Sequence, residues 1–152
     1  MNVPSAFAYT IIGPRCLREE NEGMSERIPN QDLAAVEKVV WTYLDGLHEG
    51  DTRKLAAAFH EVSHLYALGP DGVTDLPRAE WLKMVAGHPS PKSQALGRSD
   101  RIVSVDFSGP ETAFVKLECA VPPRYFTDYL TLLKLKDGWR IVSKTFRTTV
   151  RA

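Results

Sequence analysis

The sequence has little cysteine. Its two cysteines, Cys16 and Cys119, lie far apart, and neither has a second cysteine or a histidine at metal-ligand spacing. A disulfide framework and a zinc site are therefore not expected, because both rest on cysteines in short recurring spacings. This cysteine usage fits a reducing cytoplasm best. We expect a cytoplasmic protein without a metal or a cofactor.

The sequence also lacks an excess of charge of either sign. Its 19 basic and 19 acidic side chains balance, so no broad positive field attracts nucleic-acid phosphates or anionic lipid. No run approaches the roughly 20 apolar residues that span a bilayer. The apolar stretch 6–12 is interrupted by Tyr9 and Thr10 and follows no basic residues, so it makes a poor signal peptide. We expect neither a nucleic-acid partner nor a membrane.

Residues 1–30 lack a sustained helical or strand period. They carry several prolines and glycines among mixed polar residues, which predicts a poorly ordered N-terminal arm. The arm is either a disordered tail, a strap across a dimer or an extension upstream of a start at Met24. Residues 31–150 are expected to form a single domain, and a chain of this length can bury roughly two thirds of its unfolded surface.

Helix signals come first in this domain. Apolar residues between 33 and 47 recur at three- and four-residue steps, which predicts a helix with one buried stripe that ends at Gly50. Asp51 can cap a second, short helix, because its carboxylate can accept from the free amides two or three residues on. Pro77 suits the first turn of a third helix, which has Trp81 on its apolar side.

Strand signals dominate the rest of the chain. Runs 62–68 and 73–76 flank a turn at 69–72 and predict a hairpin. Asp137-Gly138 between two apolar runs is the strongest hairpin signal present. Helices followed by a strand meander predict an α+β fold, with an antiparallel sheet and the helices packed on one of its faces. The four later strands are expected at 101–107, 112–121, 125–136 and 139–150.

Segments at both ends of the domain resemble known proteins. The opening resembles that of the nuclear transport factor 2-like (NTF2-like) superfamily, through VVWTYL at 39–44, GD at 50–51 and AFH at 58–60. The closing hairpin resembles that of SnoaL-like proteins, especially those labelled "Putative lumazine-binding", through FTDYL at 126–130 and DGWRIV at 137–142. Together the resemblance spans about 31–149.

The resemblance implies a cone-shaped, cystatin-like fold with an internal pocket. It also implies a homodimer that pairs through the outer sheet faces. The matching residues are mostly packing and turn residues, and the superfamily includes isomerases, dehydratases, hydrolases and binding proteins, so the resemblance says little about chemistry.

The ketosteroid isomerases of this superfamily offer a residue-by-residue test of one reaction. Their helix tyrosine is matched here by Tyr43, but their two aspartate positions hold Ala67 and Thr131. Without a base at Ala67 and an acid at Thr131, nothing at those positions can move a carbon-bound proton or stabilise an enolate. Steroid isomerisation is not expected.

Strand alternation predicts which residues line the pocket. If Thr131 faces inward, Asp128 points outward, and the same superposition turns Val142, Lys144 and Phe146 inward on the last strand. The residues that share the face of Thr131 are Thr127, Tyr129, Leu133 and Leu135. The complete expected pocket set is Tyr43, Leu65, Ala67, Trp81, Leu117, Cys119, Tyr129, Thr131, Val142, Lys144 and Phe146.

Tyr43 and Lys144 are the two candidate catalytic residues. Lys144 either extends to water along its apolar stem or lies in the pocket, where it could bind an anion or act as a base or amine nucleophile. Tyr43 is either a core residue with a satisfied hydroxyl or a catalytic acid. Cys119 is expected to be a small buried hydrophobe rather than a nucleophile.

The histidines carry weaker signals. His60 and His64 have the spacing of a metal clamp only if that stretch is helical, and we expect them to be ordinary rim or surface residues. His88 lies in the loop 87–97, which is either an exposed loop or a lid over the pocket.

Two functions remain open from the sequence. The first is a small-molecule-binding protein with an apolar pocket that carries a few polar groups. The alternative is a cofactor-independent SnoaL-like enzyme, of isomerase, dehydratase or cyclase type, acting on a cyclic or polyketide-like substrate.

Overall fold

The computed structural model describes residues 30–152, so the predicted arm lies almost wholly outside the described residues. Helix α2 (Asn30–Glu49) is followed at once by Gly50, whose φ of 67° lies in the left-handed region that favours glycine. Helix α3 (Thr52–Ala58) begins after Asp51, whose carboxylate accepts from the amides of Arg53 and Lys54. Both the expected stop at Gly50 and the expected cap at Asp51 are confirmed. None of the described helices is long and apolar enough to cross a membrane.

The described strands form one six-stranded sheet in the order β2-β1-β6-β5-β4-β3. Neighbouring strands pair antiparallel except for β1 and β6, which run parallel. The sheet is thus mostly antiparallel, because β1 joins the meander beside its last strand. The elements after α3 are β1 (Phe59–Gly69), β2 (Gly72–Pro77), helix α4 (Arg78–Ala86), β3 (Arg101–Ser108), β4 (Thr112–Val121), β5 (Arg124–Leu135) and β6 (Gly138–Val150).

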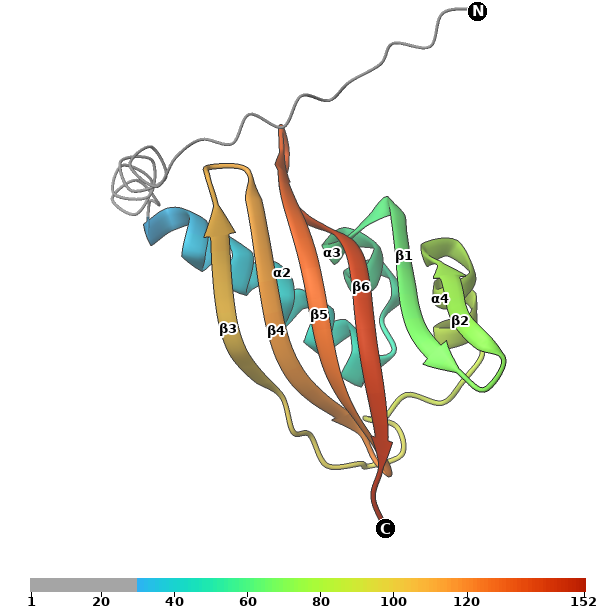
Figure 1. The fold of residues 1–152 in the computed structure, drawn as a ribbon. Helices are drawn as coiled ribbons and strands as arrows, with labels where there is room; N and C mark the ends of the chain where they lie inside the picture. Colours follow the sequence, from blue (N-terminus) through green and yellow to red (C-terminus); the bar gives the residue numbers. More distant parts are fainter. Residues whose placement is uncertain (1–29) are drawn as a thin grey trace, which may run out of the picture.

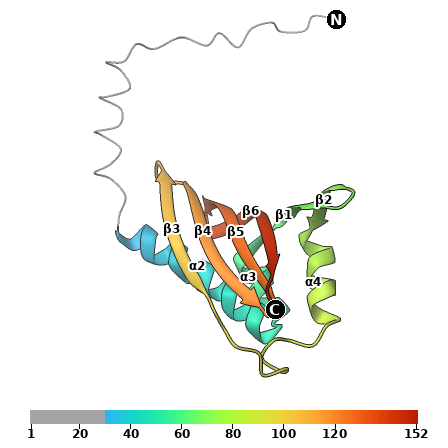
Figure 2. The ribbon, with the colours of Figure 1, turned by 60° about the horizontal axis from the view of Figure 1, so that its bottom comes forward.

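The helices gather on one face of this curved sheet. Helix α2 crosses β3 to β6 from behind in Figure 1, and the loop that follows α4 runs below the sheet to β3. The turned view places α2 and α3 under the sheet and α4 beside the β1–β2 hairpin (Figure 2). This arrangement confirms the predicted α+β cone.

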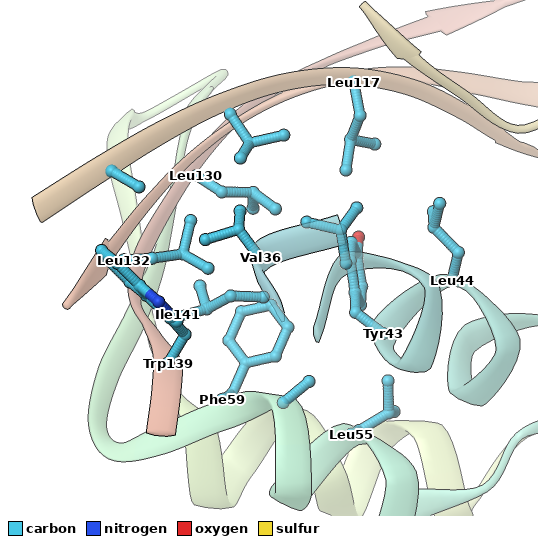
Figure 3. Close-up of a cluster of buried hydrophobic side chains, with 14 of the residues drawn as sticks. Val36, Tyr43, Leu44, Leu55, Phe59, Leu117, Leu130, Leu132, Trp139 and Ile141 are labelled. Carbon is cyan, nitrogen blue, oxygen red and sulfur yellow. The ribbon is translucent and has the colours of Figure 1, made fainter. Parts of the chain in front are cut away.

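The core fills the space between α2, α3 and the curved sheet. In Figure 3 Tyr43 points from α2 toward the sheet, and Phe59 lies at the centre of the cluster. Both side chains are fully buried, and their rings meet edge to face with centroids 5.1 Å apart. Fully burying one large apolar side chain contributes about 1.5–3 kcal/mol. The core therefore fixes α2, and with it Tyr43, against the sheet.

A β-bulge between β5 and β6 decides which residues face the helices. Thr131 pairs with Ser143, whereas Leu132 pairs with Ile141, so Val142 is one residue too many on β6. Because side chains alternate along a strand, this extra residue lets Ile141 and Lys144 both face inward. The prediction that Val142 lines the pocket is wrong, since Val142 is half-buried at the bulge and neither described cavity includes it.

The predicted inner face of β5 is also wrong, by one residue. Asp128, Leu130 and Leu132 are fully buried, whereas Tyr129, Thr131 and Leu133 lie on the outer face. Without the bulge, the register between β5 and β6 would pair Tyr129 with Lys144. The prediction that both residues face inward assumes this register. With the bulge, Leu130 stands opposite Lys144 instead.

Candidate functional site

The main cavity lies between the β1–β2 hairpin, α4, the loop after α4 and the inner face of β5 and β6. Its volume is about 330 Å³. The lining residues are Leu47, Gly50, Leu65, Leu76, Trp81, Met84, Val85, His88, Pro89, Ser90, Pro91, Val121, Arg124, Phe126, Lys144, Phe146 and Thr148. Most of them are apolar, which is typical of ligand sites.

One wall of the main cavity is the loop 87–97, which is held against the end of α2. The amide of Lys92 donates to the His48 carbonyl at 3.0 Å. A Cβ atom added at Gly50 would lie 2.9 Å from the Ser90 Cβ, so the glycine lets the loop approach closely. His88 lines the cavity, and its Nδ1 lies 2.7 Å from the Met84 carbonyl, so this nitrogen is the donor. In this structure the loop therefore packs against the end of α2 and forms one wall of the cavity.

Lys144 is the charged side chain at the inner wall of the main cavity. It is only 5% exposed, so of the two alternatives for this residue the structure shows the inward one. Its ammonium nitrogen is surrounded by aromatic rings, and cations bind favourably to ring faces at such distances. The ring centroids lie 4.7 Å away for Phe146, 5.2 Å for Tyr43, 5.7 Å for Trp81 and 6.0 Å for Phe126.

Tyr43, Asp128 and Lys144 form a buried polar cluster behind this wall. The Tyr43 hydroxyl donates to Asp128 Oδ2 at 2.6 Å, and Lys144 Nζ donates to the Tyr43 oxygen at 2.8 Å. Lys144 Nζ also lies 3.2 Å from Asp128 Oδ2 as an ion pair. Asp128 is fully buried, and its Oδ1 has no hydrogen-bond partner among the described residues. Of the three residues, only Lys144 lines the cavity.

The environment keeps two neighbouring groups neutral. Burial raises the pKa of Tyr43 well above its ordinary value, and the negative charge of Asp128 adds to this, so the phenol stays protonated and acts as a donor. Burial, again with a contribution from Asp128, raises the pKa of Cys119 to about 12. Cys119 is therefore a buried thiol, as the sequence predicts, and has almost no thiolate at neutral pH.

The structure places four of the predicted pocket residues in the main cavity: Leu65, Trp81, Lys144 and Phe146. Tyr43 and Leu117 are fully buried in the core, and Cys119 lines a separate cavity of about 140 Å³. Ala67 is half-buried on β1 and does not line either cavity. Tyr129 and Thr131 face outward, as described above. The catalytic roles of Tyr43 and Lys144 stay predictions.

Asp128 is the main site residue that sequence reasoning missed. The prediction that it points outward is wrong, because it is fully buried and pairs with Lys144. The sequence position of Asp128 alone does not indicate burial. Had Lys144 and Tyr43 both been placed inward, the need of a buried lysine for an anionic partner would have indicated a carboxylate nearby. Arg124 and Phe126 were also missed, because no local pattern places them around one cavity. The loop residues from His88 to Pro91 line the cavity, and for this loop the sequence left open both an exposed loop and a lid.

The two histidines of β1 do not form a metal clamp. His64 Nδ1 lies 2.5 Å from Asp75 Oδ1 across the β1–β2 hairpin, at a half-exposed position. His60 instead accepts from the Val62 amide through its own Nδ1. Within residues 30–152 no group of three or more histidine, cysteine or acidic side chains could hold a metal ion.

Comparison with known proteins identifies the family to which this chain is similar. The family model described as "Putative lumazine-binding" matches residues 31–147. A search of the curated proteins finds no significant match.

Three similar solved structures show the same fold. An NTF2-like protein of unknown function from Silicibacter pomeroyi DSS-3 is 24% identical, with a TM-score of 0.70 over 79% of this chain and 98% of that one. Another from Methylobacillus flagellatus KT is 22% identical, with a TM-score of 0.71 over 82% and 97% of the two chains. A ketosteroid isomerase-like protein from Erwinia carotovora atroseptica SCRI1043 is 16% identical, with a TM-score of 0.63 over 81% and 100%. At these identities the likeness shows the NTF2-like fold alone.

Proposed function

Because this chain belongs to the family described as "Putative lumazine-binding", we propose that it is an NTF2-like protein that binds a small ring-containing molecule in its main cavity. The observation that carries the proposal is the combination of a largely apolar cavity of about 330 Å³ with Lys144 at its inner wall. Ligand sites generally pair an apolar lining with few well-placed polar groups.

The cavity volume favours a small ligand. It lies near the lower end of the roughly 300–1,000 Å³ that small-molecule sites occupy. The rings of Trp81, Phe126 and Phe146 line it, and flat ligands stack well on such walls. Lumazine, the compound named in the family description, is a flat bicyclic molecule with carbonyl acceptors, and it is therefore a suitable first probe.

Lys144 supplies the polar anchor. An ammonium group has three N–H donors. The ammonium of Lys144 donates one hydrogen bond to Tyr43 and forms an ion pair with Asp128, which leaves donor capacity for an acceptor atom of a ligand in the cavity. Because Tyr43 and Asp128 hold the amine in place, a ligand pays little entropy to find it.

Native mass spectrometry of the purified protein tests this function, together with a thermal-shift screen that includes lumazine. A retained small molecule, or a ligand-dependent rise in melting temperature that Lys144→Met weakens, is the expected result. Lys116→Met is the matched control, because Lys116 lies over the Tyr129 ring on the outer face. A protein without retained ligand that no compound in a broad screen stabilises contradicts the proposal.

A second candidate function is acid–base catalysis by the same cluster. Asp128 supplies a buried carboxylate beside Tyr43 and Lys144. Ala67 and Thr131, which occupy the two aspartate positions of the ketosteroid isomerases, supply none. In this function Lys144 would contact the substrate, and Tyr43 and Asp128 would position its ammonium group next to a substrate oxygen where negative charge develops. The carbon-bound proton would pass to a water molecule in the cavity, because Asp128 does not line it.

Deuterium exchange distinguishes the two functions. An enzyme of this kind should speed exchange of the hydrogens next to the carbonyl of a bound cyclic ketone in D₂O, measured by proton NMR. Tyr43→Phe and Lys144→Met should each reduce that rate, whereas Lys116→Met should not. Binding without any acceleration of exchange leaves the binding function and removes the enzymatic one.

We also propose that the chain forms a homodimer through its outer sheet face. Four large apolar side chains on β3, β4 and β5 are each about two fifths exposed there: Val103, Phe114, Tyr129 and Leu133. The rings of Phe114 and Tyr129 stack with centroids 5.9 Å apart and form a flat surface. A second copy of this face would cover that apolar area symmetrically.

A further inference from the structure

We propose that the ligand has two chemically distinct ends: a neutral hydrogen-bond acceptor at Lys144 and a carboxylate at the cavity mouth beside Arg124. Its body is apolar and ring-containing, so the ligand class is a cyclic or aromatic keto acid. This inference rests on the proposed binding function and specifies the ligand and its orientation in the same cavity.

The inner end should be neutral because the charges of the cluster already balance. Lys144 and Asp128 are one cation and one anion, 3.2 Å apart. Asp128 is fully buried and Lys144 nearly so, so water screens neither charge well. A ligand carboxylate at Lys144 would place two anions against one cation. A carbonyl oxygen would accept from an N–H of Lys144 without adding charge.

The outer end should be anionic because Arg124, among residues 30–152, is an exposed cation whose guanidinium makes no hydrogen bond or ion pair. None of the residues that line the main cavity is acidic, so nothing there competes for Arg124. Guanidinium binds carboxylates through two parallel N–H donors. The mouth therefore favours a carboxylate over a neutral group.

Arg124 and Lys144 lie at opposite ends of the part of β5 and β6 that lines the cavity. Arg124 pairs with Val150, and Leu130 pairs with Lys144. The backbones of Arg124 and Lys144 therefore lie about 20 Å apart, given about 3.3 Å per residue in a strand. Phe126 and Phe146 lie between them on the cavity side. Both side chains are long and shorten this span, so a bicyclic ring system is the ligand size that we propose for the space between the two cations.

Three synthetic probes separate the two ends: 6-acetyl-2-naphthoic acid, its methyl ester and 6-ethyl-2-naphthoic acid. Their dissociation constants can be measured by isothermal titration calorimetry. The acid should bind about threefold to fivefold tighter than the ester, since an exposed ion pair has a modest effect. The acetyl acid should bind about tenfold tighter than the ethyl acid, since the lost hydrogen bond is to a charged donor in a buried place. Added salt should reduce only the first difference.

Variants assign each end to its residue. Arg124→Gln should abolish the preference for acid over ester and leave ester binding unchanged. Arg147→Gln is the matched control, because Arg147 lies on the same strand pair but on the outer face. The double variant Lys144→Met/Asp128→Asn should abolish the preference for acetyl over ethyl. The double variant is used because it leaves no unpaired buried charge and so keeps the fold.

The outcomes separate this inference from the binding function. Equal affinity for all three probes, or no binding of any probe at its solubility limit, overturns the inference, while a ligand retained by the purified protein would still support binding. A preference for acid over ester that the double variant removes and Arg124→Gln retains also overturns it, because the carboxylate would then lie at the inner end.

Discussion

Replacing Lys144 by methionine tests how the buried cluster is stabilised. The variant removes the ammonium but leaves Asp128 fully buried, with the Tyr43 hydroxyl as its remaining partner. Breaking a buried ion pair by removing one member typically costs about 3–5 kcal/mol. For a chain of this length that loss lowers the melting temperature by about 10 °C.

Asp128→Asn should be clearly milder than Lys144→Met. Lys144 lines the cavity, so its flexible stem can turn the unpaired ammonium away from its buried wild-type position and into the cavity, and the amide at residue 128 keeps an acceptor for Tyr43. The expected loss is about 1–2 kcal/mol, the scale of one weakened hydrogen bond. The double variant Lys144→Met/Asp128→Asn should resemble Asp128→Asn, because it contains no unpaired buried charge.

Urea unfolding of the wild type and the three variants measures these differences. An Asp128→Asn variant as unstable as Lys144→Met, or a double variant worse than both, would refute the reasoning that Asp128 is the more deeply buried charge.

The other predictions concern separate regions. Asp32→Asn should destabilise the fold at neutral pH, because hydrogen bonds from Trp139 and Lys134 lower the pKa of Asp32 below its ordinary value of 3.8. This stabilisation is present above that value and is lost as pH falls through the folded pKa, so urea melts of variant and wild type should converge in acid. Iodoacetamide at about pH 8 should label Cys119 only after unfolding, read from the mass of its peptide. Phe114→Lys should shift sedimentation toward monomer, whereas Val73→Lys, at an exposed site on β2, should not.

The elements of the fold could be predicted because their signals are local. Asp51 caps α3 through amides two and three residues away, and Asp137-Gly138 turns one strand directly into the next. Such signals depend on neighbours in the sequence, so a single chain displays them. The closing hairpin and the three helices appear where these patterns indicate.

The polar half of the site could not be predicted in the same way. Tyr43 and Asp128 lie 85 residues apart, and Lys144 lies 101 residues from Tyr43. An aspartate on a strand with apolar residues on both faces is placed outward by default, because burying it alone is costly. The bulge at Val142 also lacks a local mark such as glycine. Only the three-dimensional structure shows that Asp128 forms an ion pair with Lys144.

The close contact between Gly50 and Ser90 implies that the size of the cavity is set by backbone spacing. The missing Cβ of Gly50 allows the loop to rest directly on the end of α2. A larger residue there would lift Ser90 and the prolines on either side of it, and the cavity would widen at that wall while Lys144 and Arg124 stayed in place. In the proposed binding function, ligand size would thus depend on Gly50 and ligand polarity on Lys144 and Arg124, so a change in one property can leave the other intact.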